Sequence, residues 1–258
     1  MSAPQATQVG LFLGSWTHHT CTHSCSPVAD NAQVQLQLLD TRQSVLDKVR
    51  QRPELLEQSF LMGHTSTPKA LVLTQQGDVL VSLDDGGALL VWDMRGHRTC
   101  TAVPPASPDD CLHTVVAHPD GRHVLVGGTR PERLAGRISD SMEPLLCLLD
   151  AQTQRWVAEL RSDLLGAPAV RNRLYWTEVT CLAISADGQY AVAGDAWGTL
   201  TAWDLLKRQH VATVEQAHSG VVCTLAFSPD LRQLVSGGQD HLLRLWDWDD
   251  VLAGKAQG

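Results

Sequence analysis

The sequence predicts an all-β fold of repeated four-stranded antiparallel sheets. Three segments share one order of features: an alternating apolar strand, a tight polar turn, a second apolar strand that ends in small residues, and a third strand that ends in Trp-Asp. These copies end at Trp92, Trp203 and Trp246, each followed by aspartate, and a looser copy ends at Leu149. The shortest interval, 43 residues between Trp203 and Trp246, is the length of one four-stranded unit.

Repeats of this length predict a β-propeller, in which each sheet forms one blade. We expect four recognisable blades at about residues 60–94, 111–150, 178–205 and 218–248. A partial N-terminal blade is expected over residues 8–50, because Val9–Trp16 has the pattern of a second strand and Val34–Asp40 that of a third.

The chain beyond these strands is harder to assign. Ser44–Val49 fits an outer fourth strand and also a short helix; we prefer the strand, with a helical turn at Glu54–Gln58. The propeller then spans residues 8–250, with disordered termini at residues 1–7 and 251–258.

The repeats resemble the WD-repeat family, since Gly63-His64 precedes Trp92 and Ala217-His218 precedes Trp246 at the family's spacing. The resemblance implies a buried hydrogen-bonded set in each repeat: a histidine before the first strand, a Ser or Thr on the second, an aspartate in the next turn and the tryptophan of the third. The matching residues are His64, Ser82, Trp92 and one of Asp84 or Asp85 in one repeat, and His218, Ser236, Asp240 and Trp246 in the last.

Two repeats depart from this pattern. In the repeat that ends at Trp203, Ala193 replaces the serine and Trp197 occupies the aspartate position. In the copy that ends at Leu149, Val126 also replaces the serine. The resemblance covers about residues 8–249, and it is specific for the fold.

The number of blades raises the question of how the ring closes. The commonest closed member of the family has seven blades and needs roughly 290 residues, whereas this chain has 258. Three explanations remain open: a fragment of a longer protein, a propeller completed by a partner, and a closed five-bladed ring with degenerate blades. An open ring leaves strand edges unpaired, which favours association.

Composition excludes several classes of function. The net charge of −8 and the pI near 5.7 argue against nucleic acid as a partner. No apolar stretch approaches the roughly 20 residues that cross a bilayer, and the N-terminus lacks a secretory signal. The seven cysteines are odd in number and scattered, which indicates reduced thiols and an intracellular protein, cytoplasmic or nuclear.

Long insertions are expected on one face of the propeller. The connections from strand two to strand three and from strand four to the next strand one emerge together, and we call this side the insertion-bearing face. The irregular segments that fall there are Thr17–Ala32, Ala102–Asp110, Thr129–Glu143 and Ser162–Thr177. Insertions on one side of a repeat scaffold are typical of a binding face, although tolerated surface variation gives the same pattern.

One insertion has residues that bind metal. Cys21, His23 and Cys25 offer thiolate and imidazole ligands at short spacing, as zinc requires. Their spacing is not that of a standard zinc knuckle and no second ligand pair is near, so a polar loop is the favoured interpretation and we assign no metal or cofactor. No nucleophile, phosphate-loop or kinase motif is present, and no catalytic residue is assigned.

Trp197 is the leading candidate for partner binding. An indole cannot replace an inward-pointing aspartate, so it either fills the space beneath strand three or projects on the insertion-bearing face. A projecting ring would be flanked by Asp195 and by the inserted Arg171, Arg173 and Tyr175, a mixture typical of interface hot spots.

The sequence therefore favours a non-enzymatic scaffold that docks other proteins within a larger intracellular assembly, a conclusion that depends on analogy of fold. The alternatives are a metal-dependent or hydrolytic site on the insertion-bearing face, and an accessory C-terminal propeller of a large multidomain protein.

Overall fold

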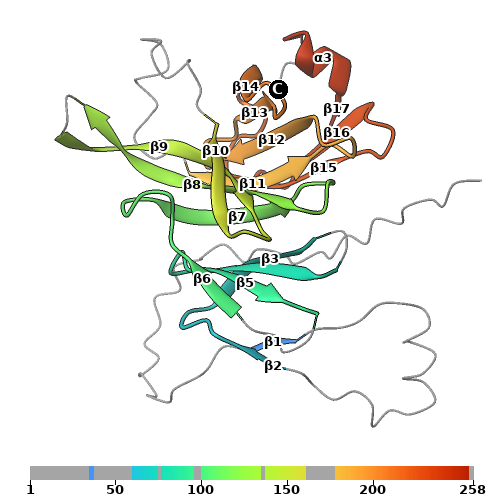
Figure 1. Cartoon of the computed structure of the whole chain (residues 1–258). Helices are drawn as coiled ribbons and strands as arrows, with labels where there is room; N and C mark the ends of the chain where they lie inside the picture. Colours follow the sequence, from blue (N-terminus) through green and yellow to red (C-terminus); the bar gives the residue numbers. More distant parts are fainter. Residues whose placement is uncertain are drawn as a thin grey trace, which may run out of the picture. The chain divides into compact units, whose positions relative to one another are not determined.

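The structure is a computed structural model that describes residues 35–37, 60–74, 77–95, 100–134, 137–160 and 178–255. All of these belong to one compact unit, Ala32–Gly258. Within them, every regular element except one short helix is a β-strand (Figure 1).

Four consecutive antiparallel sheets confirm the predicted blades. The first blade contains β3 (Pro68–Leu73), β4 (Val79–Asp84), β5 (Leu89–Asp93) and β6 (Cys100–Val103). The second contains β7 (Cys111–Ala117), β8 (His123–Leu134), β9 (Arg137–Asp150) and β10 (Arg155–Glu159). The third contains β11 (Val179–Ile184), β12 (Tyr190–Asp195), β13 (Leu200–Asp204) and β14 (Gln209–Val214). The fourth contains β15 (Val222–Phe227), β16 (Gln233–Gly238) and β17 (Leu243–Asp247).

Each blade packs its face on the next one. The first strands of successive blades are neighbours, β3 with β7, β7 with β11, and β11 with β15. One apolar cluster joins Leu89 and Val91 of the first blade to Leu112 and Leu149 of the second. Equivalent clusters join the second blade to the third and the third to the fourth. The core is therefore a series of layers between blades, which follows from strands whose two faces are both apolar.

The partial N-terminal blade is described only in two short strands. β1 (Gln35–Gln37) lies within the expected third strand Val34–Asp40, and it pairs antiparallel with β2 (Phe60–Met62). β2 leads directly to His64, as β14 leads to His218, so β2 has the place in sequence of an outer strand. Val9–Trp16, Ser44–Val49 and Glu54–Gln58 lie outside the described residues.

The insertion Thr129–Glu143 is not an irregular loop. It extends β8 and β9 into a long hairpin, with Thr129 opposite Pro144 and Leu134 opposite Arg137. The two strands stay paired from Thr129 to Leu134, apart from one register shift between Pro131 and Arg133, and this pairing satisfies backbone groups that an irregular loop would leave to solvent, so this part of the sequence expectation was wrong. Ala102–Asp110 does connect two blades, whereas Thr17–Ala32 and residues 161–177 lie outside the described residues.

The chain leaves the fourth blade after three strands and turns into helix α3 (Trp248–Leu252). Asp247 caps this helix, because its side chain accepts hydrogen bonds from the backbone N–H groups of Asp249 and Asp250. The Trp248 ring packs edge-on against Tyr190 and Phe227, at centroid distances of 5.5 and 4.8 Å. Val251 is buried with it, so the expected disorder of residues 251–258 does not hold at this position.

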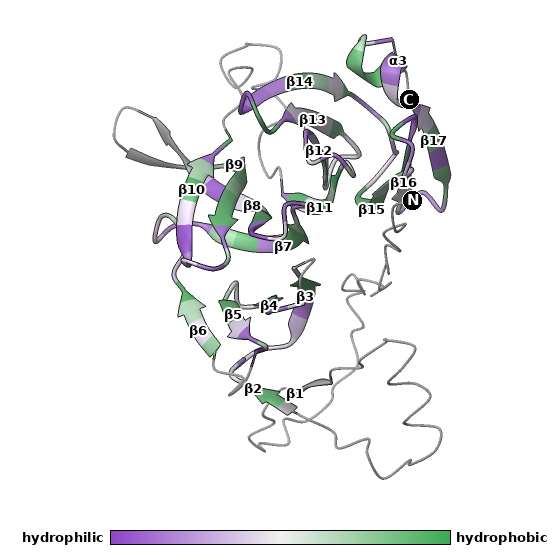
Figure 2. Ribbon diagram, turned by 45° about the vertical axis from the view of Figure 1, so that its right-hand side comes forward, coloured by the Kyte–Doolittle hydropathy of each residue, from purple (hydrophilic) through white to green (hydrophobic). Residues whose placement is uncertain are grey.

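This route leaves leucines of β17 exposed. Leu243 is 77% exposed, whereas Leu89 and Leu200, at the same position in the first and third blades, are 1% and 2% exposed. Leu245 is also exposed, and Figure 2 shows hydrophobic colour on β17. In the first and third blades the following blade covers these positions, so β17 presents a surface of the kind that blades bury.

We expect the isolated chain to associate through this surface. Replacing both Leu243 and Leu245 with serine should lower the apparent mass in solution without loss of folding, because exposed apolar edge strands promote association. Light scattering over a concentration series measures this. Leu206→Ser, at a 75% exposed leucine between β13 and β14, is the control. A cooperative monomer at every concentration for the unmodified chain would contradict the prediction.

Candidate functional site

The first and fourth blades each contain a chain of buried hydrogen bonds. In the first blade, Trp92 Nε1 donates to Ser82 Oγ over 2.7 Å, and Ser82 Oγ lies 2.6 Å from His64 Nε2. His64 Nδ1 lies 3.0 Å from Asp84 Oδ2. A carboxylate only accepts, so Nδ1 carries the proton and Nε2 of a neutral ring accepts from the serine hydroxyl. Of the two candidate aspartates, Asp84 makes this contact.

The fourth blade repeats the arrangement with a different aspartate position. Trp246 Nε1 donates to Ser236 Oγ over 2.8 Å, Ser236 Oγ lies 2.7 Å from His218 Nε2, and His218 Nδ1 lies 2.9 Å from Asp240 Oδ1. Asp240 stands two places further along its turn than Asp84 does, because Gly238 occupies the place of Asp84. Burial alone would raise the pKa of Asp240, but hydrogen bonds from His218 and from the Ser219 and Leu242 N–H groups lower it to about 2.

The second blade uses an ion cluster instead. Arg130 Nε donates to Asp110 Oδ1 over 2.5 Å, and Arg130 Nη1 donates to Glu159 Oε1 over 2.8 Å. These residues come from β8, from the segment before β7 and from β10. The cluster therefore joins three parts of one blade, as the histidine chains do elsewhere. The hydrogen bonds that Arg130 donates to Asp110 raise the pKa of the guanidinium further, despite its burial.

The third blade has neither a histidine chain nor an ion cluster of this kind among its described residues. The turn between β12 and β13 instead directs Trp197 toward solvent. Trp197 is 55% exposed, so the indole does not fill the space beneath β13. Asp195 Oδ1 accepts from the Trp197 and Thr199 N–H groups, over 2.9 and 2.8 Å. Burial raises the pKa of Asp195, and these bonds offset part of that rise.

Each first strand contains a β-bulge near its start. The bulged residues are Lys69, His113, Thr180 and Cys223, at equivalent positions of the four blades. A bulge re-aims the side chain of the extra residue. Here the bulges place one polar or ionisable side chain per blade where the first strands begin, next to the insertion-bearing face.

Two of these residues form a polar cluster with Glu178. His113 Nδ1 lies 3.3 Å from Lys69 Nζ and 3.1 Å from Glu178 Oε1, and His113 Nε2 lies 3.1 Å from Thr129 Oγ1. Burial lowers the pKa of His113; the Glu178 carboxylate opposes this effect and the Lys69 ammonium adds to it. The ring is therefore neutral near pH 7.

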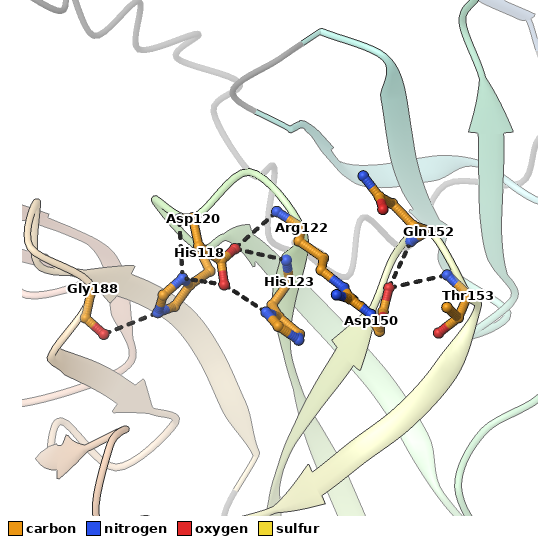
Figure 3. A network of polar contacts seen from close by, with 8 residues as sticks. All are labelled: His118, Asp120, Arg122, His123, Asp150, Gln152, Thr153 and Gly188. Carbon is orange, nitrogen blue, oxygen red and sulfur yellow. Dashed lines mark hydrogen bonds and ion pairs between the residues drawn. The ribbon is translucent and has the colours of Figure 1, made fainter.

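A second polar network lies at the turns between strands one and two (Figure 3). Asp120 Oδ2 contacts His123 Nδ1 over 2.5 Å and His118 Nδ1 over 3.2 Å, and His118 Nε2 donates to the Gly188 carbonyl of the third blade over 3.0 Å. Burial would raise the pKa of Asp120, but hydrogen bonds from His123 and Arg122 lower it to about 2. This network ties the second blade to the third on the side opposite the insertion-bearing face.

The remaining sequence candidates fall outside the described residues: Cys21, His23, Cys25, Arg171, Arg173 and Tyr175. Within the described ranges, no three potential metal ligands come together. Cys147 and Cys181 are buried thiols there, and burial raises the pKa of Cys181 to about 12. No helix in this part of the chain is long and apolar enough to span a bilayer.

Sequence reasoning missed the Arg130 cluster and the Lys69–His113–Glu178 cluster. A signal for the first was available, because Arg130 follows Val126 by the same four positions that separate Asp240 from Ser236. The Lys69–His113–Glu178 cluster depends on the register shift in each first strand. The strand pairing in the structure reveals this shift, whereas the spacing of residues in the sequence does not.

We expect His218→Ala to lower the free energy of unfolding by about 1–3 kcal/mol, because it removes the acceptor of the buried Ser236 hydroxyl and the side-chain donor to Asp240. His218→Ala, Ser236→Ala and the double variant form a thermodynamic cycle, measured by urea unfolding. The loss in free energy of unfolding of the double variant should be smaller than the sum of the two single losses. Arg232→Ala, in an exposed turn of the same blade, is the control. Additive losses would contradict a coupled chain.

Acid should weaken the fourth blade through Asp240. The folded pKa of about 2 lies below the ordinary value of 3.8, so the stabilisation is complete above roughly pH 4 and is lost as the pH falls toward 2. Asp240→Asn should therefore flatten the pH dependence of the urea midpoint in this window. Asp85→Asn, in the corresponding turn of the first blade, should leave the slope unchanged; equal slopes for Asp240→Asn and the unmodified chain would refute the assignment.

Comparison with known proteins agrees with this geometry. The model for "WD domain, G-beta repeat" matches residues 175–204 and 208–247. Cilia- and flagella-associated protein 52 of Chlamydomonas reinhardtii is 23% identical over 78% of this chain and 28% of its own length. Target of rapamycin complex subunit wat1 of Schizosaccharomyces pombe is 22% identical over 73% of this chain and 53% of its own length. The chain thus spans at most about half of these relatives.

A solved structure supports the fold. The β-propeller domain of Cps50 (Swd1) from Myceliophteria thermophila superposes with a TM-score of 0.55 at 21% identity, over 73% of this chain and 55% of that domain. The matched repeats, the relatives and the series of antiparallel blades agree: the chain contains WD repeats over residues 175–204 and 208–247, and it has the fold of a WD-repeat β-propeller.

Proposed function

We propose that this protein is a non-enzymatic scaffold that docks partner proteins on its insertion-bearing face, with Trp197 as an anchor. WD-repeat propellers generally serve as protein-interaction scaffolds, which supports the general role. The docking position is specific to this chain, and the exposure of Trp197 is the observation that supports it.

The turn around Trp197 is held rigidly, as an anchor requires. Asp195 accepts two backbone N–H groups of the turn, and the Asp195 N–H bonds to the Thr199 carbonyl over 3.1 Å. Gly198 has φ +83°, and a Cβ atom there would lie 1.9 Å from the His218 carbonyl oxygen. Only glycine fits this contact. The indole therefore needs little ordering on binding, which lowers the entropic cost of association.

We further propose that the protein is a component of a larger assembly. One relative, wat1, is by its name a subunit of the target of rapamycin complex. The exposed leucines of β17 give this chain a second apolar surface, separate from the Trp197 turn, through which a multi-protein contact can form.

Replacing Trp197 with alanine should abolish partner capture while folding is retained. An exposed anchor contributes about 2 kcal/mol or more to binding, whereas its truncation leaves the core intact. Partner capture is measured by proximity cross-linking in cells, and the melting temperature is measured for the same variants. Leu206→Ala, at another exposed hydrophobic residue, is the matched control. A fall in melting temperature with a proportionate fall in capture would place Trp197 in the core and sink the assignment.

A further inference from the structure

The Trp197 turn is joined directly to a carboxylate. The Ala196 N–H donates to the Glu178 carbonyl over 3.1 Å. Trp197 is the next residue after Ala196, so this backbone hydrogen bond holds the Cα atoms of Glu178 and Trp197 near each other. The first and fourth blades have the same bond, from Asp85 to Thr67 and from Gln239 to Val221. Of these three blades, only the third has an indole and a carboxylate at these places.

Glu178 shares its hydrogen-bond partner, His113 Nδ1, with Lys69. Its side chain is 47% exposed and contacts His113 Nδ1, the same atom that Lys69 Nζ approaches. One ring nitrogen can donate to Glu178 or accept from Lys69, but it cannot do both. Because burial keeps His113 neutral near pH 7, the ring supplies no positive charge to the carboxylate. A cation that took Glu178 would leave His113 free to accept from Lys69.

The other carboxylates near this turn, Asp195 and Asp240, already accept hydrogen bonds within the structure. Asp195 accepts the backbone N–H groups of Trp197 and Thr199, and Asp240 contacts His218 and the Ser219 N–H. Both nevertheless add negative potential around the turn, within a chain of net charge −8. Glu178 is therefore the carboxylate that remains available to a partner beside the indole.

Given the docking role proposed above, we propose that Trp197 and Glu178 recognise a basic segment of a partner protein, with an arginine guanidinium stacked on the indole and paired with the carboxylate. A planar guanidinium suits both contacts, because it stacks on aromatic faces and donates in a fork to carboxylates. A neutral apolar segment would use the indole alone, and an acidic one would be repelled.

The test uses two fluorescein-labelled peptides and the full chain. One has the sequence Gly-Ser-Arg-Gly-Arg-Ser-Gly, and in the other both arginines are replaced with citrulline, which keeps the planar shape and removes the charge. Fluorescence anisotropy should show the arginine peptide binding about fivefold or more tightly than the citrulline peptide, and less tightly as salt increases.

Variants locate the site. Trp197→Ala and Glu178→Gln should each weaken binding of the arginine peptide about threefold or more, with melting temperatures unchanged. Asp85→Asn and Leu206→Ala, an exposed carboxylate and an exposed leucine elsewhere, should have no effect.

Three results would overturn the inference: equal affinity for the citrulline peptide, no loss on Glu178→Gln, or no binding of either peptide. If Trp197→Ala still abolishes partner capture in the cross-linking experiment, the docking role stands and the partner's chemistry is different. If Trp197→Ala leaves capture intact, the docking role itself fails.

Discussion

The fold depends on polar contacts that hold the end of the second strand, or the turn that follows it, in each of the four described blades. In the first and fourth blades a chain of hydrogen bonds runs from tryptophan through serine and histidine to aspartate, and each donor in it has one acceptor. Buried polar groups are costly unless every one is paired. Such a chain therefore fixes the relative positions of three segments, and the apolar layers between blades can then pack on a defined frame.

The other two blades show that this constraint can be met differently. In the second blade, Arg130 of β8 is held by charge instead, through Asp110 before β7 and Glu159 of β10. In the third blade, Asp195 closes its own turn, and Thr180 Oγ1 donates to the Val222 carbonyl of the fourth blade over 2.5 Å. Once the turn is held by its own aspartate, the position that is Asp240 in the fourth blade has no inward role. A tryptophan can then occupy it and face solvent.

The blades could be predicted from sequence because their signals are local and repeated. Strand alternation, turn residues and the final Trp-Asp each lie within a few residues, and the spacing repeats. The Arg130 cluster was only partly predictable: the position of Arg130, four residues after Val126, is a signal in the sequence, but its ion partners Asp110 and Glu159 match no family pattern. Lys69 and His113 meet at the bulges of two neighbouring first strands, which the sequence spacing does not show. The route of the chain after Asp247 also depends on tertiary contacts, since Trp248 needs the rings of Tyr190 and Phe227.

The four bulges have a consequence for how such a protein diversifies. Lys69, His113, Thr180 and Cys223 occupy one structural position four times, yet they share no chemistry. The bulged residue lies outside the regular pairing of its ladder, so selection can exchange its side chain without repacking the layers between blades. Duplication of a blade therefore supplies a new copy of a variable position on a repeated frame, and the surface where the first strands begin can acquire a new ligand preference one substitution at a time.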